Sequence, residues 1–243
     1  MLTEKDGPVY PEAEFVRVTY KALNALGFDS ENTIACAGLC RDEITQPLAA
    51  AIKEVWGESF NTSSLAGMFF SGKTGLSAAM HHAPNCGGRE RYVFYTLPHI
   101  AVDEGGRVGV CRRRGREGES TACGALVAFR NEMVSGRLCL DFDKEDIEQS
   151  LLKARLIREV TYGTVPDLLE LTIMAQKAAL ADLEGALAAI VDTRRSDYAV
   201  VSGVQVHGPQ DNFVWRGSCC AVVGGSRREA ALEAPARDKA IFG

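Results

Sequence analysis

The chain has 243 residues, of which 46% are hydrophobic and 24% are charged, and its formal net charge at pH 7 is −5. This composition is typical of a globular protein with a substantial hydrophobic core, and the acidic balance argues against a general nucleic-acid-binding protein. No apolar run reaches the roughly 18 residues that a membrane-spanning helix needs, so we expect no membrane segment.

The first part of the chain predicts a helix, a strand and a second helix. Residues 11–26 place apolar side chains at helical spacing, and Gly27 follows as a stop signal. Residues 32–39 (NTIACAGL) are a short apolar run that predicts a buried strand. The helix that follows is expected to be capped by Asp42 and to end at about Trp56.

The middle of the chain continues this alternation. Residues 72–84 predict a turn and a helix that ends at a proline. Residues 91–103 (RYVFYTLPHIAVD) predict the strongest strand, because aromatic and β-branched residues favour strands. Residues 103–120 predict a hairpin, and a helix follows with Cys123 in its first turn.

The last part is predicted to be helical before it ends in strands. Residues 143–192 carry apolar residues at three-and-four spacing, which predicts a helical arm. Residues 197–224 predict a pair of strands around a GPQDN turn. We find no repeat or linker. We therefore expect a single α/β domain over residues 1–243, with a mainly parallel central sheet flanked by helices.

Two thiols and one imidazole stand where predicted strands end or a helix begins. Cys40 follows the first strand, His99 lies near the end of the second, and Cys123 begins a helix. Open α/β sheets bind ligands at the carboxyl ends of their strands, and zinc takes Cys and His ligands in a tetrahedron. Because three protein ligands leave a fourth position open, we interpret this trio as a candidate catalytic zinc site.

Other interpretations of these thiols stay open. The chain has eight cysteines, and buried cysteine is a common core residue. Without a secretory signal, free thiols and metal ligands are expected rather than disulfides. Cys36 is the first rival ligand, because a strand would place it on the same face as Cys40.

Residues 67–74 (GMFFSGKT) match the phosphate-binding-loop pattern in full. Lys73 and Thr74 could contact nucleotide phosphates at the start of a helix. However, the preceding segment is a poor strand, and the three residues after Gly67 are bulky where a phosphate needs open backbone. A tight turn before a helix is therefore the competing interpretation.

Two further polar features have ordinary structural interpretations. The basic run at residues 111–116 (CRRRGR) is typical of a solvated hairpin or a partner-contact loop. His207 stands beside a Gly-Pro pair, and we interpret it as a residue at a strand end or in a turn.

Five longer motifs resemble one family. They are CRDEITQPL, SGKTGLSAAMHHAP, GGRERYVFYTLPHIAVD, RRRGREGESTACGAL and YAVVSGVQVHGP. Together they are similar to the limiting-CO2-inducible protein B family, or theta class, a divergent relative of the β-type carbonic anhydrases. The resemblance spans roughly residues 10–225. It implies a β-carbonic-anhydrase-like fold, a homodimer, and zinc bound by Cys40, His99 and Cys123.

The activity implied by the resemblance is reversible hydration of CO2 to bicarbonate, which makes the protein a lyase. Zinc-bound hydroxide would attack CO2 while Asp42 orients the zinc-bound water. Alternatively, Asp42 could bind zinc itself and close the fourth position until an arginine captures it. Proton removal needs a relay, and of the neighbouring imidazoles His81 and His82 we single out His82. Both could instead only favour the helix dipole.

One position departs from the β-type pattern. Common β-type enzymes carry Cys-x-Asp-x-Arg, and Ile44 stands at the arginine position here. Arg41 is the nearest substitute as the partner of Asp42, provided that it lies in a turn. Arg89 and Arg91 lie at the other end of a strand, some 25–30 Å away, unless a second subunit supplies them.

The resemblance also implies a role in carbon concentration or bicarbonate handling. CO2 and bicarbonate are the expected ligands, with no nucleic-acid or membrane partner. The alternative is a non-catalytic zinc-binding interaction protein in a carbon-concentrating complex, which the displaced arginine favours. The acidic start of the sequence does not resemble a signal peptide. We expect a cytoplasmic protein, or one of the chloroplast stroma if a transit peptide has been removed.

Overall fold

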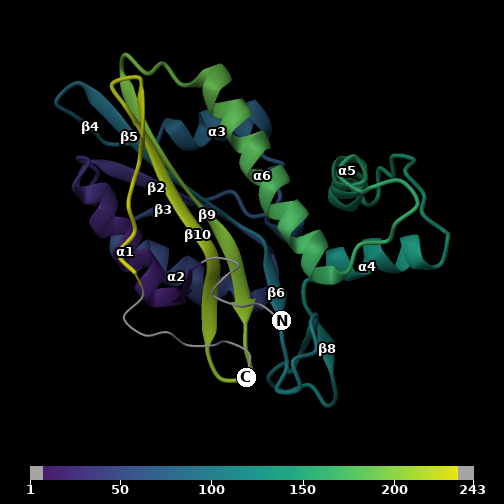
Figure 1. Cartoon of the computed structure of the whole chain (residues 1–243). Helices are drawn as coiled ribbons and strands as arrows, with labels where there is room; N and C mark the ends of the chain where they lie inside the picture. Colours follow the sequence, from purple (N-terminus) through teal and green to yellow (C-terminus); the bar gives the residue numbers. More distant parts are fainter. Residues whose placement is uncertain (1–7, 235–243) are drawn as a thin grey trace.

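A mixed sheet organises residues 8–234, the part of the chain that this computed structural model describes (Figure 1). The main strands lie in the order β1 (Val9–Pro11), β10 (Asn212–Val223), β9 (Ser196–His207), β5 (Arg89–Leu97), β2 (Thr33–Leu39) and β3 (Ser59–Asn61). Three short strands extend the sheet: β11 (Ser226–Glu229) on β10, β4 (Asn85–Cys86) on β5, and β6 (His99–Ala101) on β9.

The strands from β9 to β3 are parallel, and β10 and β1 form an antiparallel edge. The parallel part follows from helices that connect successive strands, whereas β9 and β10 are joined by a tight turn that reverses the chain. This arrangement confirms the predicted α/β fold with a central sheet flanked by helices. The predicted strand pair at residues 197–224 forms the antiparallel edge.

Helices cover both faces of the sheet. One face carries α1 (Glu12–Asn24) and α2 (Gln46–Trp56), and the opposite face carries α3 (Gly72–Met80) and α6 (Leu168–Ile190) (Figure 1). Beside α6 pack α4 (Gly124–Val134) and α5 (Ile147–Leu156). Within residues 8–234, none of the helices combines the length and apolar character that crossing a bilayer requires.

The central strand β5 shows why the sequence forms this layered core. Val93 and Tyr95 contact the layer of α1 and α2, whereas Tyr92 and Phe94 contact the layer of α3 and α6. Successive side chains of a strand point to opposite faces, so a strand covered on both sides is apolar throughout. The run of aromatic and β-branched residues therefore predicts a central strand correctly.

The predicted helical arm at residues 143–192 contains α5 and α6. Asp167 starts α6 with a capping box, in which its carboxylate accepts from the Glu170 amide and the Glu170 carboxylate accepts from the Asp167 amide. The apolar side of α6 then spans the sheet and the helices α4 and α5. This packing brings α4 and α5 to the carboxyl ends of the parallel strands.

A buried ion pair closes the opposite end of the sheet. Asp197, only 2% exposed, accepts from Arg89 Nε at 2.9 Å and from the Gly224 amide at 2.8 Å, and Arg91 lies 3.7 Å away. Burial raises the pKa of Asp197, but the hydrogen bonds from Arg89 and Gly224 outweigh it and hold the pKa below its usual value. Arg89 and Arg91 thus bind a buried carboxylate at the amino ends of the parallel strands.

Arg89→Leu is expected to lower the free energy of unfolding by about 2 kcal/mol at pH 7, because the buried carboxylate of Asp197 then keeps only the Gly224 amide and the more distant Arg91 as partners. The wild-type advantage exists above the unfolded pKa of about 3.9 and is lost as pH falls through the lower folded pKa of Asp197. Urea unfolding at pH 7 and in acid measures both effects. Arg194→Leu, which removes an exposed pair with Asp192, is the matched control and should change little. Equal effects of the two variants would contradict the prediction.

Candidate metal centre

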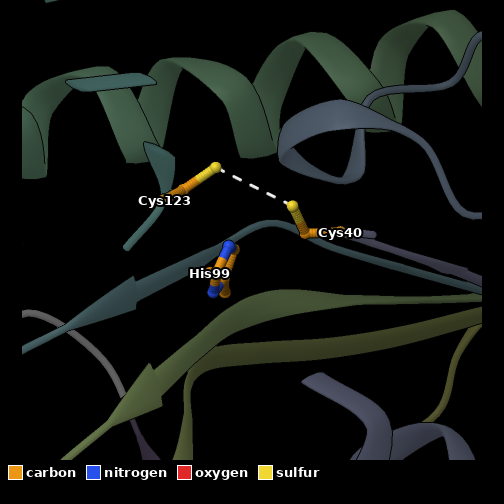
Figure 2. A group of neighbouring side chains, drawn as sticks. All are labelled: Cys40, His99 and Cys123. Atoms are coloured by element: carbon orange, nitrogen blue, oxygen red, sulfur yellow. Dashed lines mark hydrogen bonds between the residues drawn. The ribbon is translucent and has the colours of Figure 1, made fainter. Parts of the chain in front are cut away.

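Three side chains from separate elements meet at the carboxyl ends of the parallel strands (Figure 2). Cys40 follows β2, His99 begins β6 and Cys123 precedes α4. Their ligand atoms all lie within 4.8 Å of one another, and the two Sγ atoms are 3.8 Å apart. All three residues are at most 3% exposed. The structure therefore brings together the trio that the sequence singled out.

Strand register explains how Cys40 and His99 become neighbours. Leu39 pairs with Leu97 in the parallel ladder of β2 and β5, so the two strands end at the same level. Pro98 interrupts the second strand, and His99 then continues it as β6 along β9. Gly67 lies against this break with a φ of +65°, and a Cβ there would lie 2.6 Å from the Leu97 carbonyl oxygen.

Cys123 reaches the same point from a different direction. It is the N-cap residue of α4, with extended backbone angles and a cis peptide bond before it. Amides of the first helical turn, those of Ala125 and Leu126, interact with its sulfur and favour the thiolate. Cys40 and Cys123 also belong to the apolar cluster of α4, α5 and α6, which excludes water from the sulfur atoms.

His99 carries the clearest sign of a missing ligand. Both ring nitrogens are buried, and neither has a hydrogen-bond partner among the described residues. Buried imidazole nitrogens are normally satisfied, and a metal ion would satisfy one of them. Two sulfurs and one imidazole fit zinc by donor chemistry and leave a fourth position for a small molecule. Cys36, the rival ligand, is not in the group and packs against α3 and α6.

The two thiols are electrostatically coupled. The hydrogen bond from Cys123 lowers the pKa of Cys40, burial opposes this shift, and His99 adds to it. The same hydrogen bond and burial raise the pKa of Cys123. One sulfur of the pair is therefore readily ionised while the other keeps its proton. A divalent cation would stabilise both as thiolates, so binding would release a proton.

Asp42 lies next to the trio and is held by Arg113. Its Oδ1 and Oδ2 accept from Arg113 Nη1 at 2.7 Å and Nη2 at 2.8 Å, and Oδ2 lies 3.9 Å from His99 Nε2. Burial raises the pKa of Asp42, but the Arg113 hydrogen bonds outweigh it and lower the pKa to about 2. Asp42 caps the short 3-10 turn Glu43–Thr45 and not α2 itself, whose N-cap residue is Thr45, so the expected cap lies one turn earlier. The carboxylate is thus ionised beside the centre and bound to an arginine.

This geometry corrects the prediction that Arg41 binds Asp42. Arg41 instead donates to Glu148 of α5 at 2.5 Å, because side chains of adjacent residues diverge in extended backbone. Arg113 comes from the hairpin of β7 (Val110–Cys111) and β8 (Ser120–Thr121), within the basic run interpreted above as solvated or partner-contacting. The only sequence signals for Arg113 were that run and the missing arginine at Ile44.

His82 follows α3 and His207 ends β9, as the sequence indicates, and of these two it is His207 that lies beside His99. His82, the predicted relay, is exposed at the end of α3, with its ring 5.5 Å from that of Phe60. No described contact links it to the centre, and its relay role stays a prediction. His207 ends β9 and is buried, with its ring 5.3 Å from that of His99. Burial first, and the charge of His99 second, lower the pKa of His207 to about 3.

A cavity of about 560 Å3 is lined in part by His207, whose ring lies 5.3 Å from that of His99. Its walls include residues near Asp42 and Arg113 in the chain, together with the last residue of β9 and the first of β10: Ile44, Pro47, Cys111, Arg112, His207 and Asn212. Charged side chains also line it, among them Asp103, Arg107 and Glu119. The cavity therefore lies on the side of the centre where His207 stands.

The phosphate-loop interpretation of residues 67–74 is not supported by the local backbone. The amides of Gly67 and Met68 donate to the carbonyls of Ser64 and Leu65, both at 3.1 Å, so they do not form a free anion-binding nest. Met68 is buried in the apolar cluster with the two thiols. The segment begins at a turn that ends at Gly67 and runs into the first residues of α3 at Gly72, which agrees with the competing interpretation of a tight turn and a helix start.

Comparisons with known proteins give one consistent relationship. The family model described as "Limiting CO2-inducible proteins B/C beta carbonic anhydrases" matches residues 9–222. The crystal structure of limiting CO2-inducible protein LCIB is 35% identical, with 93% of this chain and 95% of that chain covered and a TM-score of 0.77. PtLCIB4, described as a homolog of LCIB, is 26% identical, with 94% and 98% covered and a TM-score of 0.78. No curated protein matches the chain.

Proposed function

We infer the function from one premise: the chain belongs to the family of limiting CO2-inducible proteins B and C, which are described as β-carbonic anhydrases. We propose that it is a zinc-dependent carbonic anhydrase that interconverts CO2 and bicarbonate. The observation that carries this proposal is His99, whose unpartnered buried nitrogens face two thiols within 4.8 Å. Cys40, His99 and Cys123 would hold the ion.

Other residues of the chain would orient the reacting water and admit the substrate. When bound, zinc acidifies water and so supplies the nucleophile that CO2 hydration needs. Asp42 accepts a hydrogen bond from the reacting water and orients it, because its carboxylate stays ionised beside the centre. Arg113 positions Asp42 through two hydrogen bonds and keeps the carboxylate from taking the fourth ligand position. The cavity admits CO2 and releases bicarbonate.

The decisive experiment is stopped-flow CO2 hydration by the zinc-loaded protein, together with metal analysis. The proposal requires about one zinc per chain and a rate above that of the buffer. Zinc without such a rate would favour the alternative, a zinc-binding interaction protein in a carbon-concentrating complex. The expected homodimer belongs to the same proposal, and light scattering should return twice the chain mass.

Arg113→Met is expected to reduce the hydration rate about 10–100-fold, because the carboxylate it orients is then free to move toward the ion. Zinc content should stay the same, so the rate and the metal are measured on the same sample. Arg114→Met, an exposed neighbour in the same basic run, is the matched control. A full rate in Arg113→Met would show that Asp42 needs no arginine.

A further inference from the structure

A buried polar chain lies beside the candidate centre and has no role in the mechanism above. It consists of His207 at the end of β9, Asn212 at the start of β10 and Glu12 in the first turn of α1. His207 is 5% exposed and Glu12 is 8% exposed. Burying a carboxylate and an imidazole in a core costs free energy unless hydrogen bonds compensate for the lost hydration.

The fold places these groups in a row. Asn212 and His207 face each other across the β9–β10 turn, and the His207 Nδ1 lies 3.1 Å from the Asn212 Oδ1. Glu12 accepts a hydrogen bond from the side-chain amide of Gln205, and the neighbouring Asn212 side chain lowers the pKa of Glu12 as a further donor. Gln205 is the strand partner of His99. Gln205 and His207 lie two residues apart on one strand and share a face.

The donors and acceptors in this row have one consistent assignment. Above its raised pKa of about 7, Glu12 is an ionised carboxylate that only accepts, so it takes the NH2 group of Asn212. The Asn212 carbonyl oxygen is then left for His207, whose Nδ1–H donates to it. A neutral imidazole has a single N–H, so the Nε2 of His207 carries a lone pair.

That lone pair has no partner among residues 8–234. The Nε2 atom of His207 is buried without a hydrogen bond, while the ring lines the cavity and stands edge-to-face with His99. The group is therefore an acceptor prepared for a donor that enters the site.

We propose that Asn212 and Glu12 position His207 so that its Nε2 accepts a hydrogen bond from an O–H group in the site, either that of a water or the hydroxyl of bicarbonate. This inference deepens the proposed function and rests on it. An acceptor at this place favours a protonated oxyanion over anions that lack a proton, such as nitrate, because two lone pairs repel each other. His207 is thus a specificity-determining residue, and Asn212 and Glu12 are positioning residues.

The tautomer of His207 tests the positioning without reference to activity. Long-range 1H–15N correlation spectra of the zinc-loaded protein should show an Nδ1–H tautomer for one of the four histidines, and His207→Gln should remove that signal. The spectra are recorded at pH 8.5, where Glu12 is ionised although burial raises its pKa to about 7. An Nε2–H tautomer in the wild type would overturn the proposal.

Variants of the two positioning residues sharpen this readout. Asn212→Leu removes the acceptor and should produce a mixture of tautomers, whereas Asn212→Asp keeps an acceptor and should preserve Nδ1–H. Glu12→Leu should also produce a mixture, because Asn212 is then free to reverse its amide. An unchanged tautomer in Asn212→Leu would overturn the whole proposal, and an unchanged tautomer in Glu12→Leu would remove Glu12 from it.

Kinetics test the acceptor itself. His207→Phe keeps a ring without an acceptor and should lower kcat/KM about tenfold, while His207→Gln keeps an acceptor and should recover most of that loss. A higher KM for bicarbonate would identify its hydroxyl as the donor, and a lower kcat alone would identify water. Equal losses in both variants would overturn the proposal. A zinc-loaded wild type without activity would defeat the proposed function instead, and the tautomer would then decide the positioning.

Discussion

Cys40→Ser is expected to reduce bound zinc from about one ion per chain to nearly none, and to abolish CO2 hydration with it. A serine hydroxyl does not ionise near neutral pH and is a poor zinc ligand, so the centre would keep only one sulfur and one imidazole. The Cys40 Sγ lies 3.8 Å from the Cys123 Sγ and would supply one of the two thiolates that neutralise a divalent ion. Its loss should therefore weaken zinc binding strongly.

Metal analysis after dialysis against a weak chelator measures this effect, and circular dichroism shows whether the variant folds. His99→Ala should give the same result by removing the only nitrogen ligand of the trio. Cys139→Ser is the matched control, because that thiol is exposed and outside the site. Stoichiometric zinc in both Cys40→Ser and His99→Ala would show that the trio is not the metal centre.

Asp42→Asn is expected to lower the hydration rate about 100-fold or more while zinc stays bound. The amide has nearly the same shape as the carboxylate, but it presents one acceptor instead of two and carries no charge. It can neither orient the reacting water as a carboxylate does nor hold Arg113 through two charged hydrogen bonds. The expected result is a loss of kcat without a loss of metal.

The control for Asp42→Asn is Glu43→Gln. Glu43 also pairs with Arg113 but is exposed, so its removal tests the loss of one charge near the arginine without touching the water-orienting carboxylate. Stopped-flow rates and zinc content of the two variants should be compared at the same pH. Unchanged turnover in Asp42→Asn would rule out Asp42 as the group that orients water.

Local sequence patterns correctly predicted several helices and strands of the fold. The segment expected to be a helix at 11–26 forms α1, and the segment expected to be a strand at 32–39 forms β2. Both predictions succeed because the spacing of apolar residues along the chain is a local property. The expected strand at 91–103 is interrupted at Pro98 into β5 and β6, as the missing amide of proline requires. The antiparallel edge also followed from a turn signal between two apolar runs.

The sequence also predicted the positions of the three candidate ligands, but it did not predict the side chains that surround them. Because Cys40 and His99 follow predicted strands and Cys123 begins a predicted helix, the sequence alone predicts that all three lie at one edge of a parallel sheet. In contrast, Arg113 was expected to be solvated, and His207 was expected to be an ordinary strand-end or turn residue. Both lie beside the centre.

Local sequence patterns were sufficient to place the strands and helices, and hence two thiols and an imidazole at the same edge of the sheet. The side chains around them depend on three-dimensional packing: Arg113 binds Asp42 in place of Arg41, and His207 lies beside His99. The reason is that periodicity and turn chemistry act over a few residues. The path of the β7–β8 hairpin and the position of the β9–β10 turn depend instead on packing between segments far apart in the chain.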